Sequence, residues 1–161
     1  MTIGIVVLAL LALGEPNDDQ RQAVPSTLPA SARAHLKSAT LAPIAHVDNL
    51  PAAVRSALTT LFGSERLEMA EPGAAFQSTD AIMTPDLPVR RLITAGCARD
   101  LCLVHYERGG VAHTYQVALL ALSPEKARLQ WGGLTSGPIQ GLAELKSLVV
   151  EGRVRGPVPN W

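Results

Sequence analysis

Aromatic residues are scarce in this chain of 161 residues: Phe, Trp and Tyr together make up 4% of it. Flat aromatic surfaces on which several bases or sugars could stack are therefore not available. Charge of one sign is not in excess either, because 14 basic residues balance 14 acidic ones. The basic residues are scattered and form no stripe along which a phosphate backbone would bind, so we expect no nucleic-acid partner.

Sequence motifs of the common enzyme classes are also absent. The chain contains no G-x-S-x-G, no P-loop, no G-x-G-x-x-G and no H-E-x-x-H. A Gly-rich stretch with Gly132, Gly133 and Gly137 precedes a predicted helix whose amino terminus could bind an anion. Its spacing fits no phosphate motif, and a flexible turn is the simpler interpretation. We assign no catalytic residue and expect no cofactor, and enzyme activity is the less favoured hypothesis.

Long apolar runs are confined to the amino terminus. Residues 3–13 are apolar apart from Gly4, a length that suits a signal peptide and is too short to span about 30 Å of hydrocarbon. Small residues at Ala12 and Gly14 predict cleavage before Glu15, although no Lys or Arg precedes the run. We therefore expect a periplasmic or secreted protein whose mature chain does not insert stably into a membrane. The alternatives are a buried first element of a cytosolic domain and an uncleaved anchor.

Proline interrupts the segment that follows the predicted signal peptide (residues 1–14). Residues 15–49 are rich in Ala, Ser and Pro, a composition typical of a partly disordered linker, with one short helix predicted at 30–38. A single folded domain is expected over residues 50–155, and residues 156–161 are expected to be a frayed tail.

Two helices and five strands are predicted for the folded domain. Apolar residues at helical spacing predict one helix from an Asn49 N-cap to Gly63 and another from Pro138 to Gly152. Strands are predicted between them at 76–83, 89–96, 102–108, 112–122 and 128–131. The predicted fold class is α+β with two layers: both helices pack on one face of a five-stranded antiparallel meander, in helix–five strands–helix order, and the other face is free.

Cysteine occurs only twice, and the two residues flank a predicted turn. If Arg99 and Asp100 form that turn, Cys97 lies directly opposite Cys102 on two antiparallel strands. Such a pair has Cα atoms about 4.5 Å apart, which is compatible with a disulfide. In an exported chain this favours a disulfide that fixes the register. Two buried thiols are one alternative; a redox or metal pair is another, although the spacing differs from C-x-x-C.

The predicted turns also assign side chains to the two faces of the sheet. Side chains alternate along a strand, and a second two-residue turn at Gly109-Gly110 would align three polar side chains across three strands of the free face. A carboxylate and an amide would lie one pleat away. The candidate ligand-binding residues on this face are Thr94, His105, Glu107, Thr114 and Gln116.

His105 has the most reactive side chain in this row. An exposed imidazole beside hydroxyls and a carboxylate could bind a polar ligand or act as an acid or base. The same residues also suit the ordinary solvated face of an antiparallel sheet. A metal site formed by His105, Glu107 and His113 would require a three-residue loop, because the two-residue turn directs His113 to the opposite face, beside Tyr106. We therefore expect no metal ion.

Three functional hypotheses follow from these patterns. The first is an exported, non-enzymatic domain that binds a protein or a small polar ligand through the free sheet face and the edge strands. The second is a small hydrolase-like or isomerase-like enzyme that uses His105 as acid or base, oriented by Glu107 or Thr114. The third is a structural component of the cell envelope, tethered by residues 15–49. A concave face around His105 would favour the enzyme, and a flat, solvated face either of the others.

Overall fold

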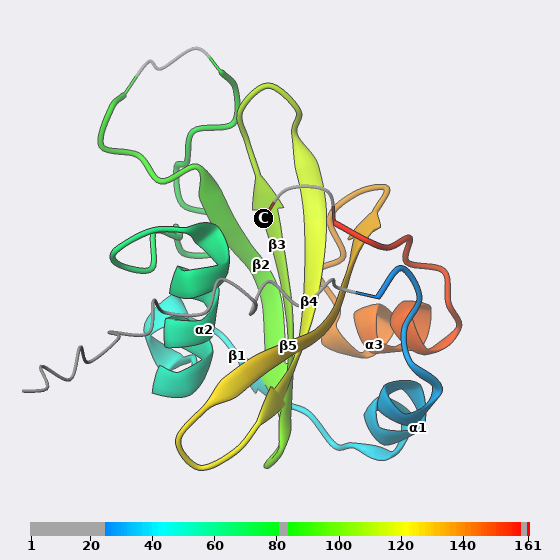
Figure 1. Cartoon of the computed structure of the whole chain (residues 1–161). Helices are drawn as coiled ribbons and strands as arrows, with labels where there is room; N and C mark the ends of the chain where they lie inside the picture. The colour runs from blue at the N-terminus through cyan, green and yellow to red at the C-terminus, as the bar shows by residue number, and fades with distance from the viewer. Residues whose placement is uncertain (1–24, 81–83, 159–160) are drawn as a thin grey trace, which may run out of the picture.

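A computed structural model describes residues 25–80, 84–158 and 161 of the chain, so the predicted signal peptide lies outside the described residues. Figure 1 shows the arrangement of the elements in space. Their order along the chain is α1 (Ala30–Ser38), β1 (Ala42–Ile44), the short 3-10 helix η1 (Val47–Asn49), α2 (Ala52–Phe62), β2 (Arg90–Cys97), β3 (Leu101–Arg108), β4 (Thr114–Leu122), β5 (Ala127–Thr135) and α3 (Leu142–Val150).

The five strands form one antiparallel sheet in the order β1-β2-β3-β4-β5, which confirms the α+β class and the antiparallel five-stranded sheet. The first strand is not the predicted one. Residues 76–80 form no strand, and 81–83 lie outside the described residues. The edge position belongs instead to β1, which pairs with the end of β2. Pro43 in β1 suits an edge strand, because proline has no N–H to donate to a second neighbour.

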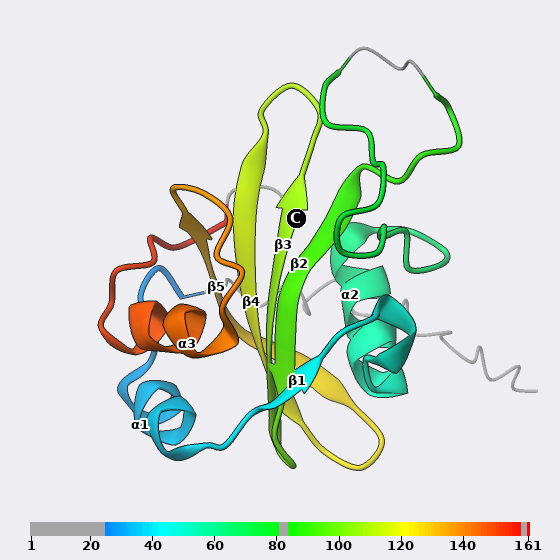
Figure 2. The same ribbon diagram turned by 180° about the vertical axis from the view of Figure 1, so that it is seen from behind.

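The helices lie on both faces of the sheet, not on one. Helix α2 packs on one face, where Leu58 and Val104 belong to a shared core. Helices α1 and α3 pack on the other, where Leu36, Leu103 and Leu145 belong to a second core. Figure 2 shows the same separation from behind. The predicted arrangement with a free sheet face therefore does not occur, and the sheet is the middle of three layers.

Burial of both faces follows from the composition of the central strands. All residues of β3 from Leu101 to Glu107 are buried, as are those of β4 from Gln116 to Leu120. Apolar side chains of these strands lie on both faces of the sheet. Each face therefore needs a packed layer of other residues to exclude water. The polar residues at one end of the meander predict a solvated face. The other end of that face is apolar and must pack against another layer, so the prediction of a free face is wrong.

Residues 25–49 belong to the folded domain, in contrast to the expected linker. Helix α1 has the predicted bounds and buries Leu36 completely. The Lys146 ammonium group of α3 donates a hydrogen bond of 2.6 Å to the Ala39 carbonyl at the end of α1. A helix of this length is marginal alone, so its packing against α3 stabilises it.

The carboxy-terminal segment is packed as well, in contrast to the expected frayed tail. Val158 is buried, and the Trp161 carbonyl accepts a hydrogen bond of 2.7 Å from the Arg90 guanidinium. The Trp161 ring lies over Gly132, where a Cβ atom would come within 1.9 Å of it. The absence of a side chain at Gly132 therefore leaves the space that the ring fills.

The helix ends follow the predicted chemistry with small shifts. Helix α2 begins after Pro51, and Gly63 ends it in the left-handed conformation with φ of 65°. Helix α3 begins after Gly141, later than predicted from Pro138, and Glu151 follows its last residue. Within residues 25–80 and 84–158, no helix has the length and apolarity needed to span a membrane.

Candidate functional site

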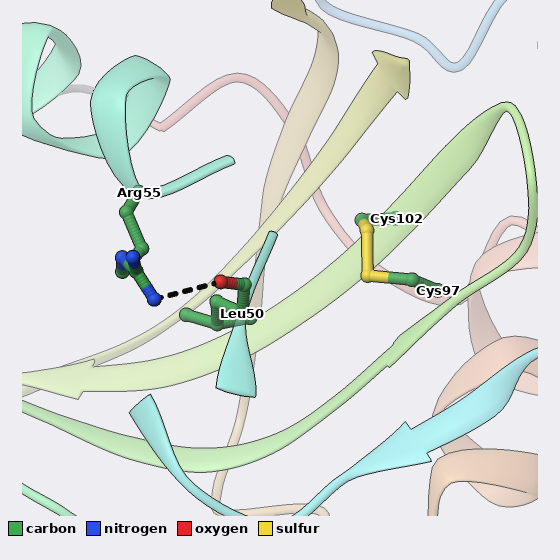
Figure 3. The surroundings of a disulfide bond; sticks show 4 residues. All are labelled: Leu50, Arg55, Cys97 and Cys102. Atoms are coloured by element: carbon green, nitrogen blue, oxygen red, sulfur yellow. Dashed lines mark hydrogen bonds between the residues drawn. A yellow bond between two sulfur atoms is a disulfide. The ribbon is translucent and has the colours of Figure 1, made fainter. Parts of the chain in front are cut away.

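The two cysteines form the predicted disulfide. Cys97 and Cys102 are opposite each other at the β2–β3 turn, with Cα atoms 4.1 Å apart. Cys102 is fully buried with Leu50 in the core under α2. Figure 3 shows the bond together with Leu50, whose carbonyl accepts a hydrogen bond of 3.1 Å from Arg55 of α2. The disulfide therefore closes the hairpin within the same core that contains Leu50, just before α2.

The pairing of β2 with β3 agrees with the prediction as far as His105. Thr94 is opposite His105, as predicted from the Arg99-Asp100 turn. The register shifts at Ile93, so Tyr106 is opposite Leu92 in place of Ile93. This bulge adds one residue to β2 and changes the face of every β2 residue beyond it.

The pairing of β3 with β4 differs from the prediction. Arg108 is opposite Thr114, so the connecting loop has five residues, 109–113, in place of a two-residue turn. His105 consequently faces Val117, three residues beyond Thr114. An odd shift moves every β4 side chain to the other face.

The five predicted site residues are therefore divided between the two faces of the sheet. Thr94, His105 and Glu107 lie on the face covered by α1 and α3, whereas Thr114 and Gln116 lie on the face covered by α2. Of the predicted row across three strands, only the neighbouring pair Thr94 and His105 is formed.

His105 is a buried structural residue in place of the expected exposed acid or base. Its side chain is fully buried, with Nδ1 2.8 Å from the Gln116 backbone carbonyl and Nε2 3.1 Å from the Ile139 backbone N–H. A carbonyl only accepts and an amide N–H only donates, so the ring is neutral and carries its proton on Nδ1. Burial lowers the pKa of His105, against smaller raising effects of the Gln116 hydrogen bond and the Glu107 charge. Neither ring nitrogen is free to exchange a proton with a substrate.

Glu107 is the centre of an ion cluster near the end of the sheet. It is 5% exposed, and its two carboxylate oxygens lie 2.7 Å from Arg91 Nε and 2.8 Å from His113 Nε2. The Arg91 guanidinium also lies 4.4 Å above the Phe76 ring and donates a hydrogen bond to the Ala74 carbonyl. The cluster connects the loop after α2 to the sheet. Its charged groups therefore stabilise the position of that loop.

His113 contacts Glu107 in this cluster and not Tyr106, which lies on the other face. His105, although on the same face as Glu107, directs both ring nitrogens to the backbone. In the part of the chain that the structure describes, no three His, Cys, Asp or Glu side chains are arranged to hold a metal ion.

Thr114 and Gln116 contribute to a second buried polar group, on the α2 face. Gln116 donates a side-chain hydrogen bond of 3.1 Å to the Thr114 hydroxyl. Tyr106 is opposite Gln116 and fully buried, and burial raises the pKa of its phenol, which stays neutral. The Phe62 ring of α2 packs edge-on against Tyr106 at 5.3 Å between centroids. This group belongs to the core and is not a solvent-facing site.

A pocket of about 300 Å³ lies elsewhere, on the α1 and α3 side of the sheet. Its lining consists of residues 26–28 and Arg33 in and before α1, Val149 of α3, Trp131 of β5, and Gly152, Val154, Arg155 and Gly156 after α3. Figure 1 shows the segment before α1, in blue, beside the carboxy-terminal segment, in red. None of the five predicted site residues lines this pocket.

Trp131 is the residue that distinguishes the pocket. It is 2% exposed, and its indole Nε1 has no hydrogen-bond partner. A Cβ atom on Gly156 would lie 3.0 Å from Nε1 and 2.8 Å from the carbonyl oxygens of Gly132 and Ser26, so only glycine lets the chain approach this closely. A buried N–H without an acceptor costs about 1–3 kcal/mol. Trp131 is also one of the residues that line the pocket, so a group bound there would lie beside its ring.

Sequence reasoning missed this pocket because its lining comes from four separate segments. Trp131 was assigned only as the last residue of a predicted strand. The available signal was weak: a large aromatic residue before two glycines, in a chain with few aromatic residues.

Comparisons with known proteins gave no match: no family model, no curated protein and no solved structure is similar to this chain. The geometry of the chain is therefore the basis of the functional argument.

Proposed function

We propose that this protein is an exported, non-enzymatic domain that binds a small polar ligand in the pocket beside Trp131. The observation that carries this proposal is the coincidence of a pocket of about 300 Å³ with a buried indole N–H that has no acceptor. Ligand pockets usually measure about 300–1,000 Å³, so this one suits a small molecule. A ligand that fills this space would lie against Trp131, which belongs to the pocket lining.

A non-catalytic role is favoured because the candidate proton-transfer groups have other partners. His105 uses both ring nitrogens for backbone hydrogen bonds, and Glu107 is paired with Arg91 and His113. The hydrolase-like or isomerase-like alternative depended on an exposed His105. A binding role requires no such group.

Export is the second part of the proposal. A disulfide such as Cys97–Cys102 persists in oxidising compartments, and the apolar run at residues 3–13 suits a signal peptide. The alternative of a tethered cell-envelope component is less favoured, because residues 25–49 of the proposed tether are folded against the sheet and α3. Amino-terminal sequencing of protein from a periplasmic or secreted fraction tests export, with a start near Glu15 expected and full-length cytosolic protein contradicting it.

Binding is tested by screening small anionic, neutral and cationic fragments while observing the Trp131 indole N–H resonance by NMR. The Trp161→Phe variant assigns the resonance, since Trp131 and Trp161 are the two tryptophans of the chain. Thr27→Phe places a ring at the pocket lining and should abolish the shift. Thr40→Phe is the matched control, because Thr40 is exposed and does not line the pocket. The proposal fails if fragments of every charge class leave the Trp131 resonance in place.

A further inference from the structure

We infer that the ligand of this pocket is an organic carboxylate with a short apolar body. This inference depends on the proposed binding function and adds the chemical class of the ligand. It follows from the charges, the neutral donors and the apolar side chains that line the pocket.

Two arginines contribute positive charge to the pocket lining. Arg33 of α1 and Arg155 of the segment after α3 are both among the lining residues. In the described part of the chain, neither forms an ion pair with a carboxylate, and no described lining residue is acidic. Two arginines without a carboxylate partner in the lining of one pocket favour an anionic ligand.

The Arg33 guanidinium is partly buried and held in place. Its Nη1 donates a hydrogen bond of 3.1 Å to the Val150 carbonyl at the end of α3, and both Nη atoms lie within 3.6 Å of the position that a Cβ would take on Gly152. A guanidinium carries five N–H donors, and the Val150 carbonyl accepts from one nitrogen. The remaining donors can serve a bidentate carboxylate.

The neutral polar groups of the lining also suit carboxylate oxygens. Ser26 and Thr27 are exposed lining residues whose hydroxyl groups can donate to a ligand. A carboxylate offers about four lone-pair sites to such donors. An ammonium group would instead lie near two arginines of the same charge.

The apolar part of the lining favours a ligand with a hydrocarbon body over a bare inorganic anion. Leu28, Val149 and Val154 are buried side chains that line the pocket. Contact with them stabilises methyl and methylene groups of a ligand by removing them from water. The pocket volume of about 300 Å³ restricts this body to a few carbon atoms.

The test compares three probes of one shape: isocaproate, its neutral amide isocaproamide, and the cation isohexylamine. Each is titrated into the full chain while the Trp131 indole resonance is followed. We expect isocaproate to bind about tenfold more tightly than the amide, since charged hydrogen bonds are roughly twice as strong as neutral ones. Isohexylamine should not bind. Added salt should weaken binding of the acid and leave the amide unaffected.

Variants of the two lining arginines test whether the preference for the acid over the amide arises in the pocket. Arg33→Gln and Arg155→Gln should each weaken isocaproate binding about tenfold and bring its affinity close to that of the amide. Arg153→Gln is the matched control, because Arg153 is exposed and does not line the pocket. Arg155→Gln keeps the test valid if loss of the Arg33 bond to Val150 disturbs the fold.

The outcomes separate this inference from the proposed function. If the amide or the amine shifts the Trp131 resonance as strongly as the acid, and Thr27→Phe abolishes the shift, the pocket binds ligands but the carboxylate class is wrong. If inorganic phosphate binds as tightly as isocaproate, the apolar body is wrong. If none of these probes nor any fragment of the broader screen shifts the resonance, the proposed function fails together with the inference.

Discussion

His105 shows how one side chain can connect distant parts of the chain through its two ring nitrogens. It joins β3 to the Gln116 carbonyl of β4 on one side and to the Ile139 N–H before α3 on the other. Both partners are buried backbone groups that water does not reach. The imidazole supplies the hydrogen bond that each of them needs. The histidine that the sequence pattern assigned to a ligand site therefore holds α3 in position over the sheet.

The first prediction concerns removal of this side chain. His105→Ala should lower the free energy of unfolding by about 2–4 kcal/mol, because it leaves a cavity and two unsatisfied backbone groups. His35→Ala is the control, since His35 is exposed and its substitution should change stability by less than about 0.5 kcal/mol. Urea denaturation followed by circular dichroism measures both. Equal, small effects would contradict the assigned role of His105.

The second prediction concerns pH. Burial lowers the pKa of His105 in the folded state below its ordinary value of 6.5, so below that pH the unfolded state binds the proton more readily. The stabilisation by neutral His105 is therefore present above about pH 6.5 and lost as the pH falls below it, by at most about 1.4 kcal/mol per pH unit. Urea melts at about pH 7.5 and 5.5 should show a smaller acid sensitivity for His105→Gln than for the natural chain. An identical sensitivity would contradict the prediction.

The β2–β3 and β3–β4 hairpins illustrate how turns control the placement of whole strands. The first is closed by the disulfide, and its register agrees with the sequence prediction from Thr94 to the cysteines. The second has a five-residue loop where Gly109-Gly110 predicted a two-residue turn. Each β4 side chain therefore lies on the sheet face opposite to the predicted one. The length of this loop therefore separates Thr114 and Gln116 from the other three predicted site residues.

The third prediction concerns the disulfide of the first hairpin. Cys97→Ala with Cys102→Ala should lower the free energy of unfolding by about 2 kcal/mol, because a short closed loop restricts the unfolded chain only modestly. Tertiary structure should persist, since the register is also maintained by strand pairing and by the core under α2. Urea melts, and NMR spectra of the variant, test the two parts. Complete unfolding of the variant would contradict the prediction.

Across the molecule, segments from both ends of the chain pack against the central sheet. Helix α1 covers one face together with α3, and Trp161 packs on the other face over Gly132. The pocket lies where the segment before α1 and the segment after α3 meet Trp131. The candidate ligand site therefore depends on the assembly of the complete domain, and a fragment covering only residues 50–155 would lack part of its lining.

The fourth prediction concerns the docking of Trp161. Gly132→Ala should destabilise the natural chain by about 1–3 kcal/mol, because the new Cβ atom would overlap the Trp161 ring. In a Trp161→Ala background the same substitution should have little effect. Urea melts of the two single variants and the double variant measure this coupling. Additive effects would show that the ring does not occupy the space over Gly132 in solution.

Short-range chemistry allowed several features to be predicted from the sequence alone. The short helix predicted at 30–38 is α1, Gly63 marked the end of α2, and the Arg99-Asp100 turn placed Cys97 opposite Cys102 and Thr94 opposite His105. Each of these depends on residues within about a dozen positions of one another, where periodicity and turn geometry act directly.

Tertiary structure alone decided the remaining features. The three residues of β1 are too few to show a period, and Gly109-Gly110 is compatible with both a two-residue turn and a longer loop, so packing of the sheet between helices selected the register. That packing buried His105 and left the indole N–H of Trp131 beside a pocket. The pocket has no local signature, because the side chains that line it come from segments distant in sequence and meet only when the three layers assemble.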